Sequence, residues 1–198
     1  MSFFEVPEPK RRPSRRRGER VDCPWTRPAT YLPSYLQDDL VVASNAEAAV
    51  VLHGIACYPT GFAFSLETVT RHEYDGDEDE PHYADLFWSA RRRGSKLPPG
   101  LLRFGISFSD GQKATTLDAT DAMDVFEPSE AGSGLRLHLG GGGGGGGRWS
   151  YEIWVTPLPP PGPVTLVCEW PAFGITETRC TIDGVRFIEA AEKAKPIF

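Results

Sequence analysis

The sequence predicts a mainly β protein, an antiparallel β-sandwich or open barrel with a short C-terminal helix. One reason is composition: 21 glycines and 18 prolines in 198 residues are too many for a helical protein and suit short strands joined by turns. The other is periodicity, because apolar and polar residues alternate along several segments and so give each strand one core-facing side. With 40% hydrophobic residues, the chain can build a sizeable core.

The first strong strands are expected at 48–58 and 61–71. The segment Ala48–Tyr58 is an apolar run typical of a buried strand, and a turn at 59–61 follows it. In the second segment, Phe62, Phe64 and Leu66 alternate with smaller or polar residues. If the first segment is a regular strand, His53 and Cys57 lie on one face about 13 Å apart. A catalytic dyad needs about 3 Å, so we expect Cys57 to be a core thiol.

A hairpin is predicted at 102–117. Apolar residues alternate with polar ones over 102–108, and Asp110 and Gly111 follow. This pair favours a two-residue hairpin turn, because glycine accepts a positive φ. The returning strand is expected at Lys113–Leu117.

Eight consecutive glycines, Gly140–Gly147, separate two further alternating segments at 135–139 and 149–155. Glycine loses the most conformational entropy when it is ordered. We therefore predict an over-long hairpin loop, mobile around 140–147, between two strands.

The chain is expected to end in two strands and a helix. The strands are Val164–Trp170 and Ile175–Thr181, and Asp183 can cap the helix that follows them. Four apolar residues of that helix fall three apart, and Pro196 is expected to stop it. These four residues are Val185, Ile188, Ala191 and Ala194.

We predict two regions, a disordered basic arm at 1–20 and a single β-rich domain at 21–198. The arm has seven basic and three acidic residues, whereas the remainder has 14 basic and 24 acidic, which gives the net charge of −6. An acidic body argues against an extended nucleic-acid surface, so only the arm could bind phosphates. The candidate partner-binding residues of the arm are Arg11, Arg12, Arg15, Arg16 and Arg17.

The four cysteines, Cys23, Cys57, Cys168 and Cys180, are far apart in the sequence and form no CxxC pair. Such spacing fits neither a zinc site nor a disulfide scaffold. The first residues contain no apolar leader segment, and no apolar run is long enough to span a bilayer. A reduced, cytoplasmic protein without membrane contact or cofactor is therefore expected.

The long polar stretch at 72–99 holds the metal candidates. His72, Asp75, Asp77 and His82 could form a carboxylate–histidine site there. An EF-hand loop starting at Asp75 fails, since Glu80 and Leu86 stand where such a loop has Gly and Glu. We therefore expect a solvated acidic loop rather than a metal centre. The glycine tract is not a phosphate-binding loop, because no Lys-Ser or Lys-Thr pair follows it.

Three segments, CYPTGFAFSL, LLRFGISFSDGQKAT and PGPVTLVCEWPAFGITETRCTID, resemble a family of soluble bacterial proteins with no assigned activity. The resemblance covers roughly residues 38–198. It implies one β-rich domain in a bacterial cytoplasm, and it transfers no catalytic residue.

The sequence therefore leaves three hypotheses for the function. The first is a non-catalytic β-sandwich that binds another protein. The second is an enzyme, small-ligand binder or metal binder that uses the 72–99 loop, with Glu169 and Glu177 near the last turn as further candidates. The third is a nucleic-acid accessory protein that uses residues 1–20. Neither the partner nor the oligomeric state can be read from the sequence.

Overall fold

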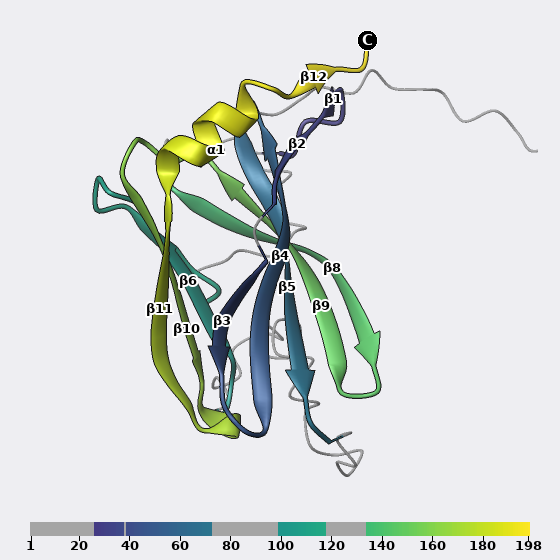
Figure 1. Cartoon of the computed structure of the whole chain (residues 1–198), viewed down its shortest axis with the longest axis vertical. Coiled ribbons are helices and arrows are strands. Elements are labelled where there is room, and N and C mark those ends of the chain that lie inside the picture. The colour runs from purple at the N-terminus through teal and green to yellow at the C-terminus, as the bar shows by residue number, and fades with distance from the viewer. Residues whose placement is uncertain (1–25, 38, 73–98, 118–133) are drawn as a thin grey trace, which may run out of the picture.

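The computed structural model describes residues 26–37, 39–72, 99–117 and 134–198. Within this part, the chain forms antiparallel strands in two main layers and one α-helix (Figure 1). The prediction of an antiparallel sandwich with a short C-terminal helix is confirmed, and no closed barrel is present among these strands.

The larger layer is a six-stranded sheet with the order β2-β4-β5-β9-β8, in which β3 also pairs with β4. Its strands are β2 (Ser34–Leu36), β3 (Leu40–Ser44), β4 (Ala48–Tyr58), β5 (Gly61–Thr70), β8 (Arg136–Gly145) and β9 (Arg148–Thr156). Strands β4 and β5 begin and end close to the bounds that the apolar patterns predict. Within the described residues, β8 is at one edge of this sheet.

The smaller layer is a four-stranded sheet with the order β11-β10-β6-β7. Its strands are β6 (Arg103–Ser107), β7 (Lys113–Thr115), β10 (Pro163–Trp170) and β11 (Ile175–Asp183). A single 3-10 turn, Pro171–Phe173, connects the last two, and Gly174 closes it at φ 64°. Strand β3 of the larger sheet lies against β11 and closes one side of the sandwich.

The core lies between the two sheets and continues under the helix. Phe64 of β5 meets Phe104 of β6 with ring centroids 5.7 Å apart, which joins the two layers. Phe62 meets Phe187 of α1 (Gly184–Ala191) at 4.5 Å, which joins the helix to the sheet. All four rings are at most 2% exposed. Burying each such side chain stabilises the fold by about 1.5–3 kcal/mol.

The helix begins where the sequence predicts, but it buries a different face. Asp183 is the N-cap, and its carboxylate accepts a hydrogen bond from the backbone N–H of Val185. The buried residues are Gly184, Phe187, Ala190 and Ala191, whereas Val185 is exposed. The prediction placed Val185, Ile188, Ala191 and Ala194 on one side. Phe187 buries more apolar area than Val185 could, so the helix turns the side of Phe187 toward the core.

The helix ends at Ala191, before the proline that was expected to stop it. The residues after it form β12 (Lys195–Pro196), which pairs with β1 (Tyr31–Leu32) in a small two-stranded sheet. The C-terminal segment and the segment before β2 therefore lie side by side (Figure 1).

The glycine tract is not the over-long loop that was predicted. Gly140–Gly145 belong to β8, and Gly142–Gly145 pair with β9 after a register shift between Leu139 and Gly142. Gly146 and Gly147 form the turn with φ of 59° and 77°. Two successive positive φ values fit a two-residue hairpin turn whose twist matches that of the strands. The loop prediction failed because glycine has no side chain and so shows no alternation. The predicted mobility of this segment stays a prediction.

The hairpin at 102–117 is present, with a different turn. The loop has three residues, since Phe108 donates a backbone hydrogen bond to the carbonyl of Gln112. Gly111 takes φ 87°, and the Asp110 carboxylate accepts from the N–H of Gln112. An aspartate that caps its own turn favours this longer loop. The returning strand is β7, which ends at Thr115 rather than at Leu117.

Candidate functional site

The outer face of the six-stranded sheet carries a bulge that changes which side chains it presents. Gly54 takes φ 66°, and the register between β4 and β5 shifts between His53 and Ala56. The extra residue inverts the alternation of β4. His53 therefore lies on the outer face and Cys57 in the core, with Cys57 0% exposed. The expectation that both share a face is wrong, while Cys57 as a core thiol is confirmed.

A small aromatic cluster lies on this outer face, apart from the main core. Tyr58 and Trp154 meet edge-to-face with ring centroids 5.6 Å apart, next to Ala56 and Ala63. Tyr58 is 2% exposed and Trp154 7%, although both point away from the sandwich interior. Tyr31 packs against them. The sheet thus holds a rigid apolar platform outside its core.

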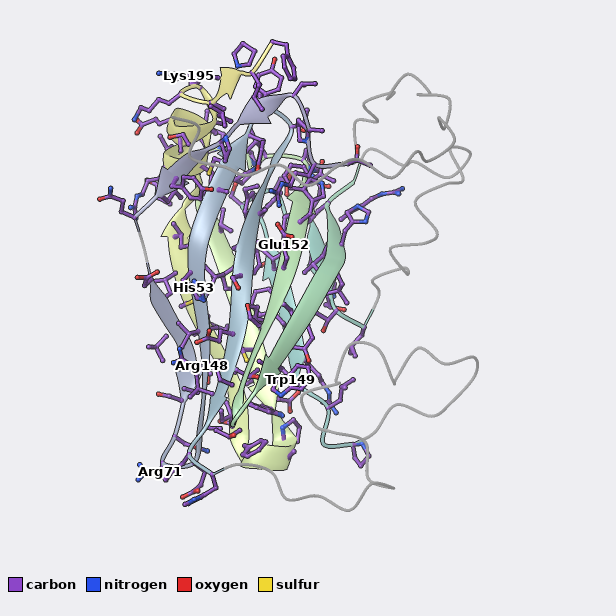
Figure 2. All side chains as sticks on the ribbon, turned by 90° about the vertical axis from the view of Figure 1, so that its right-hand side faces the viewer. His53, Arg71, Arg148, Trp149, Glu152 and Lys195 are labelled. Atoms are coloured by element: carbon purple, nitrogen blue, oxygen red, sulfur yellow. The ribbon has the colours of Figure 1, made fainter. Side chains whose placement is uncertain are left out.

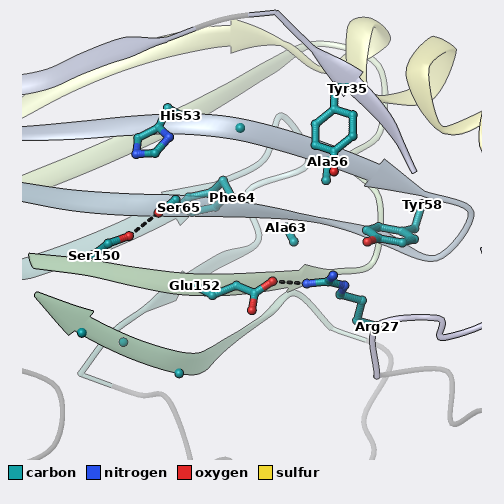
Figure 3. Close-up of a pocket in the computed structure, with 14 residues that line it drawn as sticks. Arg27, Tyr35, His53, Ala56, Tyr58, Ala63, Phe64, Ser65, Ser150 and Glu152 are labelled. Carbon is teal, nitrogen blue, oxygen red and sulfur yellow. Dashed lines mark hydrogen bonds and ion pairs between the residues drawn. The ribbon is translucent and has the colours of Figure 1, made fainter. Parts of the chain in front are cut away.

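A pocket of about 560 Å³ opens beside this cluster (Figure 3). It is lined from β2, β4, β5, β8 and β9, and from Arg27 before β1. Its polar or aromatic lining side chains are Arg27, Tyr35, His53, Tyr58, Ser65, Ser150 and Glu152. The volume is in the range of sites that hold small ligands or short peptide segments, about 300–1,000 Å³.

The pocket is open along β8 because the glycine tract has no side chains there. Gly141, Gly142 and Gly143 line it as bare backbone. Gly143 is directly opposite Ser150, so a side chain at position 143 would share the face of Ser150. A Cβ at Gly143 would meet no atom within 4 Å, which places this position beside open space.

An ion pair spans one end of the pocket. The guanidinium of Arg27 donates from Nη1 to Oε1 of Glu152, and its central carbon lies 5.4 Å from the centroid of the Tyr58 ring. Burial raises the pKa of Tyr58, and the neighbouring Arg27 opposes that rise. The phenol is therefore neutral at physiological pH and can both donate and accept a hydrogen bond. Figure 3 shows Arg27 pointing along β9 toward Glu152.

The other end of the pocket is polar. The hydroxyls of Ser65 and Ser150 are hydrogen-bonded at 2.5 Å across β5 and β9. Beside them, Glu67 lies 3.8 Å from His53 Nε2 and 3.3 Å from Arg148 Nη1. Figure 2 shows His53, Arg148 and Glu152 along the strands of this face. Each serine hydroxyl is hydrogen-bonded to the other serine. Neither is therefore bonded to a histidine that could activate it as a nucleophile.

The residues that sequence reasoning named are not brought together here. His72 is exposed, with its Nε2 3.9 Å from a carboxylate oxygen of Glu47. Glu169 pairs with Arg103 at 2.7 Å, and Glu177 pairs with Arg179 at 2.6 Å, both on the four-stranded sheet. The remaining candidates, Asp75, Asp77, His82 and the five arm arginines, lie outside the described residues.

Burial raises the pKa of all three described thiols, and the described acids and histidines form no metal-binding group. Burial raises the pKa of Cys57 to about 12, and burial chiefly does the same for Cys168. A neutral thiol is a poor nucleophile and a poor metal ligand. Burial, helped by Arg136, lowers the pKa of His138. Across 26–37, 39–72, 99–117 and 134–198, no three His, Cys, Asp or Glu side chains are grouped to hold a metal ion.

Sequence reasoning missed Arg27, Tyr35, Tyr58, Ser150 and Glu152. The alternation of β9 did indicate that Ser150 and Glu152 share the face opposite the core. Nothing in the sequence showed that β9 lies beside β5, or that a residue 125 positions earlier reaches Glu152.

No family model matches the chain, and neither a curated protein nor a solved structure is similar to it. The family resemblance and the bacterial setting stay predictions. In the part of the chain that the structure describes, no helix has the length and apolar character to cross a membrane.

Proposed function

We propose that the chain is a non-catalytic protein-interaction module whose recognition surface is the pocket on the outer face of the six-stranded sheet. The observation that carries this proposal is the convergence of aromatic and polar side chains from four strands on one depression that a glycine backbone leaves open. Arg, Tyr and backbone groups are the groups that protein interfaces favour. Tyr35 is 61% exposed at its rim, as an anchor awaiting a partner would be.

The partner fits best as an extended peptide segment. Along β4, the lining residues run from His53 to Tyr58, which is roughly 16 Å at about 3.3 Å per residue. That length accommodates about five residues of an extended chain. Strand β8, which is an edge strand among the described residues, bounds the pocket on one side, and extended segments commonly bind beside such strands.

A non-catalytic role is supported by how the polar groups are occupied. The one carboxylate lining the pocket is held by Arg27, and the two serines are held by each other. Hydrolysis or group transfer needs a nucleophile bonded to a base, and a nearby donor for the developing charge. The pocket offers binding groups without that arrangement.

The test is a selection of random peptides on the full-length chain, followed by affinity measurements on two variants. Gly143→Leu fills the pocket from a position with open space, and Gly145→Leu is the matched control. Gly145 is on the same strand and also has open space, but it does not line the pocket. Selected peptides should bind Gly143→Leu at least about tenfold more weakly and Gly145→Leu equally well. Equal binding to both variants, or no enrichment, would refute the proposal.

The two other hypotheses keep their place as predictions. A metal or small-ligand site in the 72–99 loop and nucleic-acid binding by residues 1–20 both depend on residues outside the described part. Nuclease-sensitive material that is retained by the full-length chain, and not by a chain without residues 1–20, would distinguish nucleic-acid binding from the module proposed above.

A further inference from the structure

The end of the pocket at Glu152 and Tyr58 already holds a guanidinium group. Arg27 donates to the Glu152 carboxylate, and its central carbon lies 5.4 Å from the centroid of the Tyr58 ring. These two contacts are the ones that proteins use to recognise arginine, a carboxylate for the charge and an aromatic ring for the planar face.

The residues that receive this contact belong to paired strands, whereas Arg27 belongs to none. Tyr58 is 2% exposed and packs on Trp154, and Glu152 is on β9 directly opposite Ser65 of β5. Arg27, in contrast, belongs to the segment before β1 and to no strand. The side chains of Arg27 and Glu152 are 47% and 52% exposed, and ion pairs this exposed to water stabilise a fold little. Arg27 can therefore leave this contact without disturbing the strands that carry Glu152 and Tyr58.

The charge of the chain suits a cationic partner. Residues 21–198 have 24 acidic and 14 basic residues, and the acidic excess belongs to segments outside the described residues. A net negative charge attracts basic segments at long range and raises their rate of encounter.

We propose that Glu152 and Tyr58 form a guanidinium subsite, that Arg27 is its resident occupant, and that an arginine of the partner's extended segment replaces Arg27 on binding. This inference rests on the proposed function, since the rest of the pocket would receive the residues beside that arginine. Arginine is favoured over lysine because its planar group stacks on a ring while it bonds a carboxylate.

The test measures binding of the capped tripeptide Gly-Arg-Gly to the full-length protein by NMR titration. Arg27→Ala removes the tethered competing group and should tighten binding about two- to fivefold, since an ion pair this exposed is weak. Glu152→Gln in the Arg27→Ala background should abolish that gain. The same peptide with citrulline, which is neutral but has nearly the same shape, should not bind.

The matched control is Arg103→Ala, which breaks a similarly exposed ion pair with Glu169 on the other sheet. It should leave the affinity for Gly-Arg-Gly unchanged. Thermal melting of every variant checks that each is folded. Unchanged affinity in Arg27→Ala, or equal binding of the citrulline peptide, would overturn the proposal.

The two proposals can fail separately. If selected peptides lose affinity for Gly143→Leu while Gly-Arg-Gly does not respond to Arg27→Ala, the pocket stands as the recognition surface and the guanidinium subsite is refuted. If Gly-Arg-Gly binding responds to Arg27→Ala while no selected peptide depends on Gly143, the subsite stands and the broader function is refuted.

Discussion

Single alanine substitutions along the glycine tract should change stability with alternating sign. In a strand, successive positions face opposite sides of the sheet. At Gly142 a Cβ would lie 2.6 Å from the ring of Tyr151, which is 3% exposed in the core. At Gly144 it would collide with the carbonyl of Arg148, whereas at Gly143 and Gly145 it would meet nothing within 4 Å.

The expected changes in the free energy of unfolding follow from what surrounds each added Cβ. Alanine in place of glycine restricts the unfolded chain and stabilises the fold by about 0.4–1 kcal/mol where the site is open. Overpacking a filled core costs about 1–3 kcal/mol. Gly143→Ala should therefore gain about 0.5 kcal/mol, and Gly142→Ala should lose about 1–2 kcal/mol. At about 2–4 °C per kcal/mol for a chain of this length, the two melting temperatures should differ by about 3–10 °C.

The assay is urea denaturation of the full-length chain followed by tryptophan fluorescence, with thermal melting as a second measurement. The four single variants at 142, 143, 144 and 145 should give loss, gain, loss and gain. A glycine loop without faces would respond the same way at all four positions. Four equal shifts would refute the assignment of β8 to this tract, and with it the explanation of the open pocket.

Three further predictions concern single groups. Burial raises the pKa values of Cys57 and Cys168 from 9.0 to about 12. Between these pH values the thiols ionise in the unfolded chain but stay neutral in the folded one, so the stability that the buried thiols contribute is complete below pH 9 and is lost as the pH rises toward 12. The free energy of unfolding should fall by up to about 1.4 kcal/mol per pH unit for each thiol, and the double alanine variant should show a shallower decline in denaturation at alkaline pH. Asp183→Ala removes the helix N-cap and should cost about 1 kcal/mol in urea denaturation, whereas Asp183→Asn should retain most of it. Arg27→Ala removes the cation that opposes the raised pKa of Tyr58, so that pKa should rise further in an ultraviolet titration; an unchanged or lower pKa would show that Arg27 does not lie over the ring.

The strands could be predicted because each contains side chains that alternate between water and the core. Segment 164–170 illustrates this, since every second residue from Val164 to Trp170 is buried. Segment 48–58 was predicted instead from its continuous apolar run, and it forms the long strand β4. The same reasoning failed where side chains are absent, in the glycine tract. It failed again at Gly54, where one extra residue moved His53 and Cys57 to opposite faces.

The candidate site was beyond sequence reasoning for a different reason. Its groups come from strands whose order in the sheet the sequence does not state, and from Arg27, which precedes them all. The metal candidates chosen from the sequence, His72, Asp75, Asp77 and His82, were residues close together along the chain. A site on a sheet face instead collects residues that are close across strands.

The β8–β9 hairpin also places little constraint on the length of its own glycine repeat. In most hairpins, adding or removing a residue moves side chains to the wrong face and alters the turn. Here every residue of the tract is glycine, so whichever residue occupies position 142 or 144 has no Cβ to clash with β9. Any adjacent pair of glycines can also supply the two positive φ values of the turn. Strand β9 is held in register by β5, and the shift between Leu139 and Gly142 shows that the tract already accommodates an extra residue on β8. Variants of this protein with seven or nine glycines should fold to the same sandwich and differ in that bulge or in the turn.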